Sequence, residues 1–377
     1  MAFAHLRTVA FRNLFDAEVD IRGKEIFIVG ENGQGKSNFL EALYFCSYAS
    51  SFRGCKDRDL VRNGERDCSA SLSFDKSIDI STYDSIHRNV SVTYRDGKKN
   101  ISLDGKRIED RKELLSVAPA IVLCHEDMEF VAGTPERRRW FFDQCRSLWD
   151  HLYLDDLRKY RHILKSRNAL FRDAQSRTGR ANRVSMGEIT ATLDALDPLL
   201  AQYGLELGTK RRKTAEEFSL VFEPLYREIS GIAGIGVKYL PSWKKESLDE
   251  IIAQLAERRE ADFSLGLSLS GPHRDRYVFT RDGEDFSEKA STGQRRLLAL
   301  LLSIAQARLF TEKTGKKPVL LLDDVLLELD GEKRRRFISV LPEYEQAFYT
   351  FLPEEPYESY RKSDTIVLYM QSGQIIK

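Results

Sequence analysis

Short runs of alternating apolar and polar residues dominate the first 125 residues. The segments LRTVAFRNL, AEVDI and EIFIVG follow one another, with turn residues at 22–24. A second alternating block extends from Cys68 to Leu103, with turn signals at 95–98 and 104–106. Alternation with period two, bounded by turn residues, is typical of strands. The pattern therefore predicts a mixed α/β region.

Helical periodicity replaces this alternation between about Arg146 and Gly231. One apolar stripe runs from Tyr153 to Phe171, and a second from Met186 to Leu207 repeats in steps of three and four residues. The second spacing is that of a heptad seam, so an antiparallel coiled-coil arm and an ordinary amphipathic bundle both stay open. Pro198 interrupts the seam and, with Asp197 as N-cap, could equally begin a new helix.

Strand signals return after the helical region. LGLSLSG and RYVFTRDG predict a hairpin, a helix follows from about Gly293 to Lys313, and PVLLLDD predicts a buried strand. A helix after Gly331, a strand at AFYTF and a terminal hairpin complete the chain. We therefore predict one α/β domain formed by residues 1–145 and 263–377, with residues 146–262 as an inserted helical arm.

The charge balance changes this picture only locally. Lys plus Arg number 59 and Asp plus Glu 58, a net charge of +1, which disfavours a uniformly basic nucleic-acid binder. Residues 151–183 nevertheless carry nine Lys/Arg against three Asp, a net +6. This segment is either a solvated helix face or a contact for DNA phosphates.

The remaining composition indicates a reduced, cytoplasmic protein without a membrane span. The five cysteines form no CxxC pair, which argues against a zinc site and a disulfide framework. The amino-terminal residues lack the apolar core of a signal peptide, and the longest apolar stretch is too short to cross a bilayer.

A phosphate-binding loop is the strongest chemical signal. Residues 30–37 read GENGQGKS and match G-x-x-x-x-G-K-[ST], directly after a predicted strand and before helical spacing. The glycines let the backbone amides surround a phosphate at a helix N-terminus, Lys36 reaches the β and γ phosphates, and the Ser37 hydroxyl ligates Mg²⁺. The predicted nucleotide contacts are Gly30, Glu31, Asn32, Gly33, Gln34, Gly35, Lys36, Ser37 and Asn38.

Two further segments fit this chemistry. Asp323 and Asp324 follow the apolar run at 319–322, where Asp323 would hold Mg²⁺ and Asp324 would act as base for the attacking water. STGQRR precedes the helix at 293–313, and its Ser291, Thr292, Gly293 and Gln294 form either an ordinary N-cap or a second anion site.

In this order, GENGQGKS, STGQRR and LLLDDVLLELD resemble the ATP-binding-cassette ATPases of the SMC, Rad50 and RecF group. HEDMEFVAGTPERRRWFFD (125–143), GPHRD (271–275) and SFRG (51–54) are similar to segments of the RecF family within it. The resemblance implies an ABC-type phosphate-loop ATPase head with an inserted helical arm. It also implies an ATP-dependent homodimer, in which the signature at 291–294 closes in trans on the ATP and Mg²⁺ of the other subunit.

The resemblance also implies partners and further site residues. Expected partners are duplex DNA, single-strand/double-strand junctions, RecO, RecR and the RecA recombinase that the protein helps to load. Glu126 joins Asp324 as a catalytic candidate, and Asp330 belongs to the D-loop. The DNA-contact candidates are Arg53, Arg137, Arg138, Arg139, Arg158, Lys159 and Arg161.

Departures from the cassette pattern predict slow hydrolysis. Many relatives have Glu where this chain has Asp324, and no His follows His273, so the usual switch His is missing. Thr350 falls near that position. A transporter-type ATPase subunit and a non-catalytic, SMC-like tether are the alternative functions.

Overall fold

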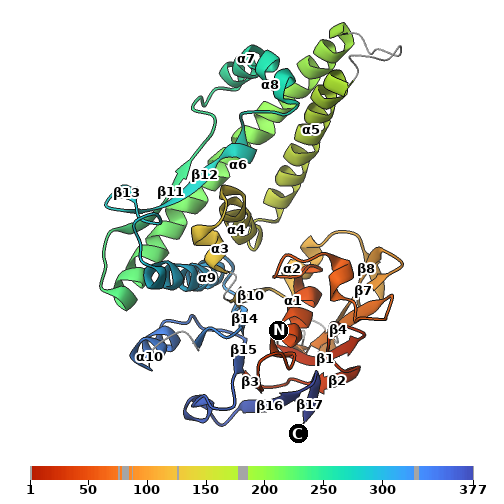
Figure 1. Cartoon of the computed structure of the whole chain (residues 1–377), viewed down its shortest axis with the longest axis vertical. Coiled ribbons are helices and arrows are strands. Elements are labelled where there is room, and N and C mark those ends of the chain that lie inside the picture. The colour runs from red at the N-terminus through yellow and green to blue at the C-terminus, as the bar shows by residue number, and fades with distance from the viewer. Residues whose placement is uncertain are drawn as a thin grey trace. The chain divides into compact units, whose positions relative to one another are not determined.

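The computed structural model describes residues 2–74, 77–78, 85–86, 88–124, 127–176, 186–326 and 331–376. The chain forms two compact units, one of residues 1–128 with 296–377 and the other of residues 129–295 (Figure 1). The predicted arm, 146–262, falls inside the second unit. Each unit is described on its own below.

Two six-stranded sheets build the first unit. The first is antiparallel, in the order β2-β1-β4-β7-β8-β9. Its strands are β1 (Phe3–Val9), β2 (Ala17–Asp20), β4 (Cys68–Phe74), β7 (Asn89–Arg95), β8 (Lys98–Leu103) and β9 (Lys106–Ile108). A separate two-stranded ladder joins β5 (Ser77–Ile78) and β6 (Ser85–Ile86).

The second sheet is mostly parallel and has the order β10-β14-β15-β3-β16-β17. Its strands are β3 (Glu25–Val29), β10 (Ala120–Leu123), β14 (Val319–Leu322), β15 (Gln346–Phe351), β16 (Thr365–Gln371) and β17 (Gln374–Ile376). All pairs are parallel except β16 with β17. Every residue of β3, β14 and β15 is buried, as expected for parallel strands covered on both faces.

Helix α1 (Lys36–Tyr48) joins the cores of the two sheets. Its Phe39, Leu40 and Phe45 belong to one cluster with residues of both sheets, such as Leu72 and Leu321. The other helices of this unit are α2 (Lys112–Val117), α10 (Gly331–Ser339) and the 3₁₀ turns η1 (Asp57–Leu60) and η5 (Tyr357–Tyr360). The start of α3 (Met128–Ala132) and most of α9 (Thr292–Thr314) also belong to it.

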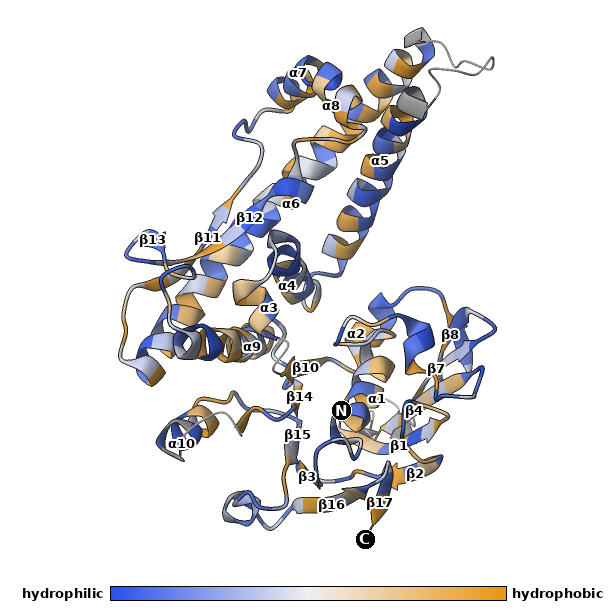
Figure 2. Ribbon diagram, viewed as in Figure 1, coloured by the Kyte–Doolittle hydropathy of each residue, from blue (hydrophilic) through white to orange (hydrophobic). Residues whose placement is uncertain are grey.

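The second unit is mainly helical. It contains α4 (Pro135–Ser147), α5 (His151–Ser176), α6 (Met186–Ser230), α7 (Leu248–Glu257), α8 (Arg259–Leu265) and the 3₁₀ turn η3 (Pro272–Arg274). A small antiparallel sheet joins β11 (Ile235–Leu240), β12 (Arg276–Arg281) and β13 (Glu284–Asp285). Hydrophilic and hydrophobic residues alternate around α5 and α6, as amphipathic helices require (Figure 2).

The arm is a bundle with more than two helices. Leu157 and Tyr160 of α5 share one core cluster with Leu200 of α6 and Ile251 of α7. Pro198 lies inside α6, which continues through it over 45 residues. Asp197 therefore begins no new helix, and its fully buried carboxylate forms ion pairs with Arg167 and Arg259 instead.

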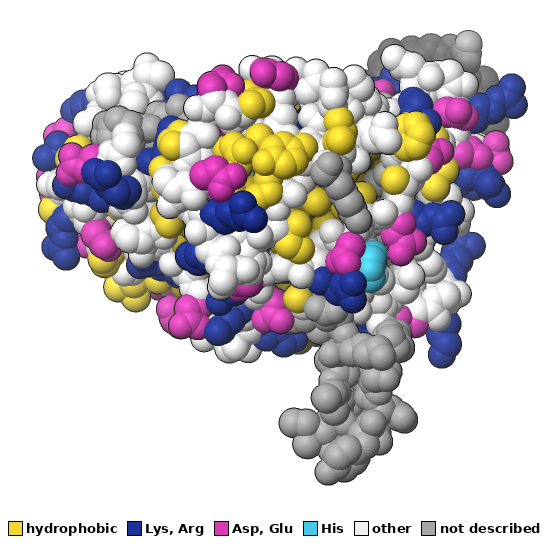
Figure 3. Space-filling model, turned by 90° about the horizontal axis from the view of Figure 1, so that it is seen from below, with side chains coloured by type: hydrophobic (Ala, Val, Ile, Leu, Met, Phe, Trp, Pro, Cys, Tyr) yellow, Lys and Arg dark blue, Asp and Glu magenta, His cyan; other side chains and the backbone are white. Residues whose placement is uncertain are grey.

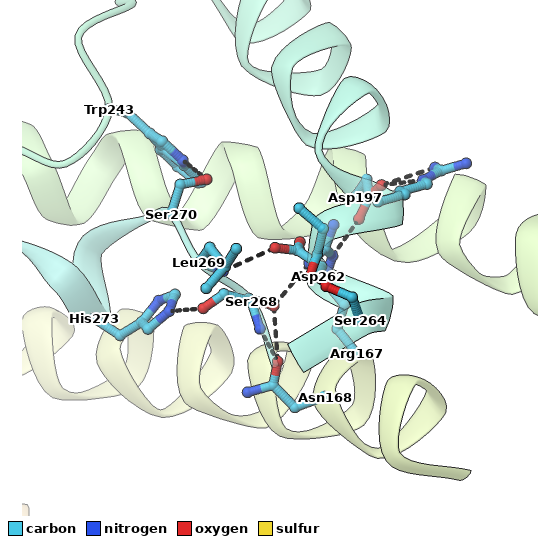
Figure 4. Close-up of polar contacts among 12 residues, drawn as sticks. Arg167, Asn168, Asp197, Trp243, Asp262, Ser264, Ser268, Leu269, Ser270 and His273 are labelled. Atoms are coloured by element: carbon cyan, nitrogen blue, oxygen red, sulfur yellow. Dashed lines mark hydrogen bonds and ion pairs between the residues drawn. The ribbon is translucent and has the colours of Figure 1, made fainter. Parts of the chain in front are cut away.

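One predicted hairpin is wrong. β12 pairs with β11 and β13, and residues 266–271 form no strand. Several polar groups of this segment are bound by side chains (Figure 4). Asp262 accepts the Leu269 amide at 2.9 Å and Asn168 accepts the Ser268 amide at 2.8 Å. Tertiary hydrogen bonds thus replace the ladder that the alternating sequence favoured.

A fully buried arginine explains how this segment is held. Arg167 of α5 donates to Asp197 of α6 at 2.7 Å and to Asp262 of α8 at 2.6 Å (Figure 4). It also donates to the Ser268 hydroxyl at 2.7 Å, and Arg259 binds the second oxygen of Asp197 at 2.8 Å. One guanidinium thus joins two helices and a loop. The charge count for residues 151–183 overstates the surface patch, because Arg167 is inside the bundle.

A second buried arginine joins α4, α6 and the segment just before β12. Arg211 binds both oxygens of Asp143 at 2.8 and 2.9 Å and Asp275 at 2.9 Å. It also donates to the Pro272 carbonyl at 2.6 Å. The HEDMEFVAGTPERRRWFFD and GPHRD segments therefore contribute one carboxylate each to this buried network.

We expect Arg167→Ala to destabilise the helical unit by about 3–5 kcal/mol, because it leaves two buried carboxylates without their shared cation. Denaturant unfolding followed by tryptophan fluorescence measures this unit specifically, since Trp140, Trp149 and Trp243 all lie in it. Arg212→Ala is the matched control.

Arg212 pairs with Glu246 at 2.9 Å, but both side chains are at least half exposed, so its loss should cost no more than about 1 kcal/mol. Equal midpoints for the two variants would contradict the assigned role of Arg167.

Candidate nucleotide-binding site

The phosphate loop joins β3 to α1 and has the backbone that its glycines allow. Gly33 and Gly35 have φ of 78° and 111°, in the region that favours glycine. Gly30 is required for another reason: a Cβ there would lie 2.4 Å from the Met370 carbonyl oxygen. The buried Lys36 ammonium donates to the carbonyls of Gly30 at 2.7 Å and Glu31 at 3.2 Å, so its charge faces the loop.

Two other segments hold the loop from outside. The Gly373 amide, in the β16–β17 turn, donates to the Gln34 carbonyl at 2.8 Å. The Asn13 side chain, after β1, donates to the Gly33 carbonyl at 3.3 Å and accepts from Asn38 at 2.7 Å. The two ends of the chain therefore fix the loop between them.

Glu41, fully buried in α1, anchors two arginines beside the loop. Arg12 binds both of its carboxylate oxygens, at 2.9 and 3.1 Å. Arg53 lies 3.7 Å from Glu41, donates to Asn38 at 2.9 Å and lies 3.9 Å from the Asp323 carboxylate. A single buried acid thus directs the Arg53 guanidinium toward the predicted metal ligand.

The acidic pair lies at the carboxyl end of β14. Asp323 is buried, whereas Asp324 is partly exposed and has φ of 53°. Thr350, one strand away at the end of β15, contacts both residues. Its hydroxyl accepts the Asp324 amide at 2.7 Å and lies 2.9 Å from the Asp324 carboxylate and 3.3 Å from that of Asp323.

These residues fit a magnesium ion that bridges to a phosphate. Mg²⁺ prefers oxygen ligands and in nucleotide sites takes one or two protein oxygens with phosphates and waters. Ser37, in the first turn of α1, and the buried Asp323 offer a hydroxyl and a carboxylate at the same edge of the parallel sheet. When bound, the ion would neutralise charge on the β and γ phosphates.

The signature segment caps α9. The Gln294 amide donates to the Ser291 hydroxyl at 3.2 Å, and the Ser291 amide donates to the Gln294 side chain at 2.8 Å. This reciprocal pair is a capping box, so the N-cap alternative describes the segment within this chain. Gly293 is different, because a Cβ there would meet nothing within 4 Å. Packing within the described chain does not require a glycine there.

The three adjacent arginines of α4 are engaged within the helical unit. Arg137 pairs with Glu129 at 2.6 Å and lies over the Trp140 ring. Arg138 donates to the Tyr277 carbonyl at 3.1 Å, and Arg139 donates to the Asp275 carbonyl at 2.7 Å. Burial lowers the pKa of Arg138 and of Arg139. These contacts orient the three guanidiniums independently of any nucleic acid.

The exposed cations of α5 form the arm patch, defined as Arg158, Lys159, Arg161, Lys165 and Arg172. Arg158 lies 3.6 Å from Asp155 and Arg161 lies 3.8 Å from Asp143, weak pairings for exposed side chains. Lys159 lies over the Tyr203 ring. Elsewhere the charges are mixed: the face in Figure 3 shows both signs interspersed among apolar side chains.

Two predicted site residues, Glu126 and Asp330, lie outside the described residues. Three residues of the site were missed or only located approximately from sequence: Arg12, Glu41 and Thr350. For Glu41 a signal existed, since a lone acid within the apolar FLEALYF segment of α1 needs a buried partner.

The parallel sheet, the phosphate loop and the acidic pair define a phosphate-loop nucleotide-binding protein. The chain resembles an SMC head bound to the C-winged helix domain of ScpA with a TM-score of 0.52 at 16% identity, over 100% of this chain and 98% of that one. That likeness supports the ATPase-head fold. The structure of "the recombination mediator protein RecF-ATP in RecFOR pathway" is far closer, with a TM-score of 0.85 at 27% identity over 100% and 97% of the two chains.

Sequence comparison gives the family. The model for the RecF/RecN/SMC N terminal domain matches residues 3–377. The DNA replication and repair protein RecF of Treponema pallidum (strain Nichols) is 41% identical over 98% of this chain and 99% of its own length. That of Rippkaea orientalis is 29% identical over 98% of each. The chain therefore belongs to the RecF/RecN/SMC N terminal domain family, and within it to the RecF proteins.

We expect Gly373→Ala to weaken ATP binding by about tenfold or more, which corresponds to a loss of about 1.4 kcal/mol of binding free energy. A Cβ at residue 373 would lie 1.8 Å from the Asn13 carbonyl oxygen, so the β16–β17 turn must leave the loop. Titration with a fluorescent ATP analogue measures the effect.

Gly97→Ala is the matched control. Gly97 has φ of 75°, against 79° for Gly373, but a Cβ there meets nothing within 4 Å. It therefore carries the same backbone strain without the clash. Similar nucleotide affinities for both variants would show that the turn does not support the loop.

Proposed function

We propose that this chain is an ATP-dependent DNA-binding protein of recombinational repair and replication. It binds ATP and Mg²⁺, closes as a homodimer on duplex DNA near single-strand gaps, and hydrolyses ATP slowly. With RecO and RecR it helps to load the RecA recombinase. The observation that carries the proposal is the nucleotide site: Lys36 of the phosphate loop and the acidic pair Asp323 and Asp324 lie at one edge of the sheet, and Arg53 lies 3.9 Å from Asp323, in a chain whose relatives are named DNA replication and repair protein RecF.

Slow hydrolysis is supported by the residues at this edge. Asp324 has one methylene fewer than the glutamate of many cassette ATPases, and its carboxylate lies within hydrogen-bond distance of Thr350. In the proposed reaction, water attacks the γ-phosphorus, ADP leaves, and Asp324 accepts the proton of the water. A short acid with one oxygen engaged suits an ATP-gated clamp better than a rapid motor.

Dimerisation by ATP is supported by the signature segment. The capping box uses the amides of Ser291 and Gln294, and between them a Cβ at Gly293 would meet nothing within 4 Å. A helix N-terminus with an uncovered glycine accepts a close phosphate. The phosphate would be the γ-phosphate bound by a second copy of the chain.

DNA contact is assigned to the arm patch rather than to the three adjacent arginines of α4. The side chains of Arg158, Lys159 and Arg161 are exposed, whereas Arg138 and Arg139 are half-buried on backbone carbonyls. Exposed cations on one helix can follow phosphates of a duplex backbone.

Two other functions would give different results in the tests below. A transporter-type subunit would respond to a membrane partner and not to DNA. Among the helices that the structure describes, none is long and apolar enough to cross a membrane. A tether of the SMC type would bind ATP without releasing phosphate.

The first test measures phosphate release with and without gapped duplex DNA. We expect DNA to stimulate hydrolysis in the wild type. Arg158→Glu, Lys159→Glu and Arg161→Glu combined should weaken duplex binding and lower the slope of log affinity against log salt by about 2–3, because each lost phosphate contact removes about 0.9.

The matched control changes Arg22, Lys316 and Lys317 to Glu. These three exposed cations lie near the amino ends of the parallel strands, at the opposite edge of the sheet from the nucleotide site. It changes the net charge equally and should leave the salt slope unchanged. An unaltered salt slope in the arm variant would show that the arm patch is a solvated helix face that does not contact DNA.

The second test concerns the dimer. We expect Ser291→Arg to retain ATP binding but lose ATP-induced dimerisation, because the long cation fills the space above Gly293. Light scattering with ATP and Mg²⁺ measures the dimer. Ser264→Arg, at an exposed serine of α8, is the control. Dimerisation of Ser291→Arg at the wild-type ATP concentration would rule out the sandwiched arrangement.

A further inference from the structure

Thr350 lies between the two halves of the nucleotide site. In the sheet, β15 is the strand between β14, which ends at the acidic pair, and β3, which ends at the phosphate loop. Leu322 is in register with Tyr349, and Phe351 with Val29. Thr350 is therefore level with Asp323, the first residue after β14, and in register with Ile28, two residues before the phosphate loop begins at Gly30.

The Thr350 hydroxyl serves the acidic pair in two ways. It accepts the Asp324 amide at 2.7 Å, which satisfies a backbone donor where the chain turns with φ of 53°. Its single proton points to a carboxylate, either that of Asp324 at 2.9 Å or that of Asp323 at 3.3 Å. One buried hydroxyl thus holds the backbone of Asp324, donates to one carboxylate of the acidic pair and lies next to the other.

The position of Thr350 is itself fixed from both sides. The Gly30 amide, at the start of the phosphate loop, donates to the Phe351 carbonyl at 3.1 Å. The Leu352 amide donates to the Glu355 carboxylate at 2.8 Å. Burial raises the pKa of Glu355, and the negative charge of Asp324 acts in the same direction. Thr350 cannot shift without moving the loop or this buried acid.

We propose that Thr350 is a positioning residue for ATP hydrolysis, which sets the Asp323 oxygen for the metal and the Asp324 oxygen for the attacking water. This inference rests on the proposed function, because it refines the same site. Thr350 acts through the two carboxylates and not by direct contact with the γ-phosphate. It therefore contributes to the hydrolysis step and to metal affinity, and little to nucleotide affinity.

The decisive variants are Thr350→Val and Thr350→Ser. Valine keeps the volume but leaves the Asp324 amide without its acceptor and both carboxylates without the donor. We expect kcat to fall about 10- to 100-fold, the usual consequence of removing one well-placed hydrogen bond to a charged group. Serine retains the hydroxyl and should remain within about threefold of the wild type.

Thr365→Val is the matched control. Thr365, at the amino end of β16, also accepts a backbone amide, that of Lys362 at 2.8 Å, and donates to a carboxylate, that of Glu25 at 3.3 Å. It loses equivalent bonds at the opposite end of the same sheet. Its melting temperature should fall as that of Thr350→Val does, while its kcat stays unchanged.

Three measurements on the full chain separate the outcomes: kcat and KM for ATP, affinity for a fluorescent ATP analogue, and Mn²⁺ binding by electron paramagnetic resonance with AMP-PNP present. Lower kcat and weaker Mn²⁺ binding at unchanged nucleotide affinity support the inference. Wild-type kcat and Mn²⁺ binding in Thr350→Val overturn it. A loss confined to nucleotide affinity also overturns it, because Thr350 would then contact the nucleotide directly.

A double variant tests whether Thr350 acts through Asp324. If it does, adding Thr350→Val to Asp324→Asn lowers kcat by much less than it lowers that of the wild type. Full additivity contradicts the positioning role. If the wild type releases no phosphate, the proposed ATPase fails, and the Mn²⁺ titration of Thr350→Val alone decides whether Thr350 orients the metal ligand.

Discussion

The parallel order of β14, β15 and β3 is the constraint on which the nucleotide site depends. Because the strands run in one direction, the acidic pair, Thr350 and the phosphate loop all emerge at one edge. The three strands are buried throughout, so the polar groups at their carboxyl ends keep fixed positions relative to one another. Glu41 extends this order into α1, because its two arginines are directed by a carboxylate that has no access to water.

The helical unit depends on a similar device in its own core. Arg167 and Arg211 are each surrounded by two carboxylates, and each joins segments that are far apart in the sequence. Buried pairs of this kind add little net stability compared with apolar residues, but breaking one is costly. The HEDMEFVAGTPERRRWFFD and GPHRD segments contribute Asp143, Arg139 and Asp275 to this core.

The sequence alone was sufficient to predict features that depend on one contiguous segment. The loop at 30–37, the strand before Asp323 and the capping residues of α9 each follow local rules of spacing and backbone conformation. It was insufficient where a side chain is used by a distant segment. Nothing near Arg167 reveals that Asp262 and Ser268 will surround it, so it was counted among the surface charges of the arm. Residues 266–271 alternate like a strand, but the side chains of Asn168 and Asp262 accept the amides of Ser268 and Leu269.

Thr350 shows the same limit at the site itself. Its neighbours predict a buried strand correctly, but its role depends on which strand lies beside β15, and strand order is not encoded locally.

The near-neutral net charge of the chain can be explained by the same distinction between buried and exposed side chains. With Arg167 buried, the arm patch of one chain offers only a few exposed cations, and a few phosphate contacts bind DNA weakly at physiological salt. Under the proposed function, two such patches joined by ATP act as one bivalent surface, whose affinity rises steeply without any new contact. A single chain that binds weakly is then what makes the ATP-bound dimer the state that holds DNA.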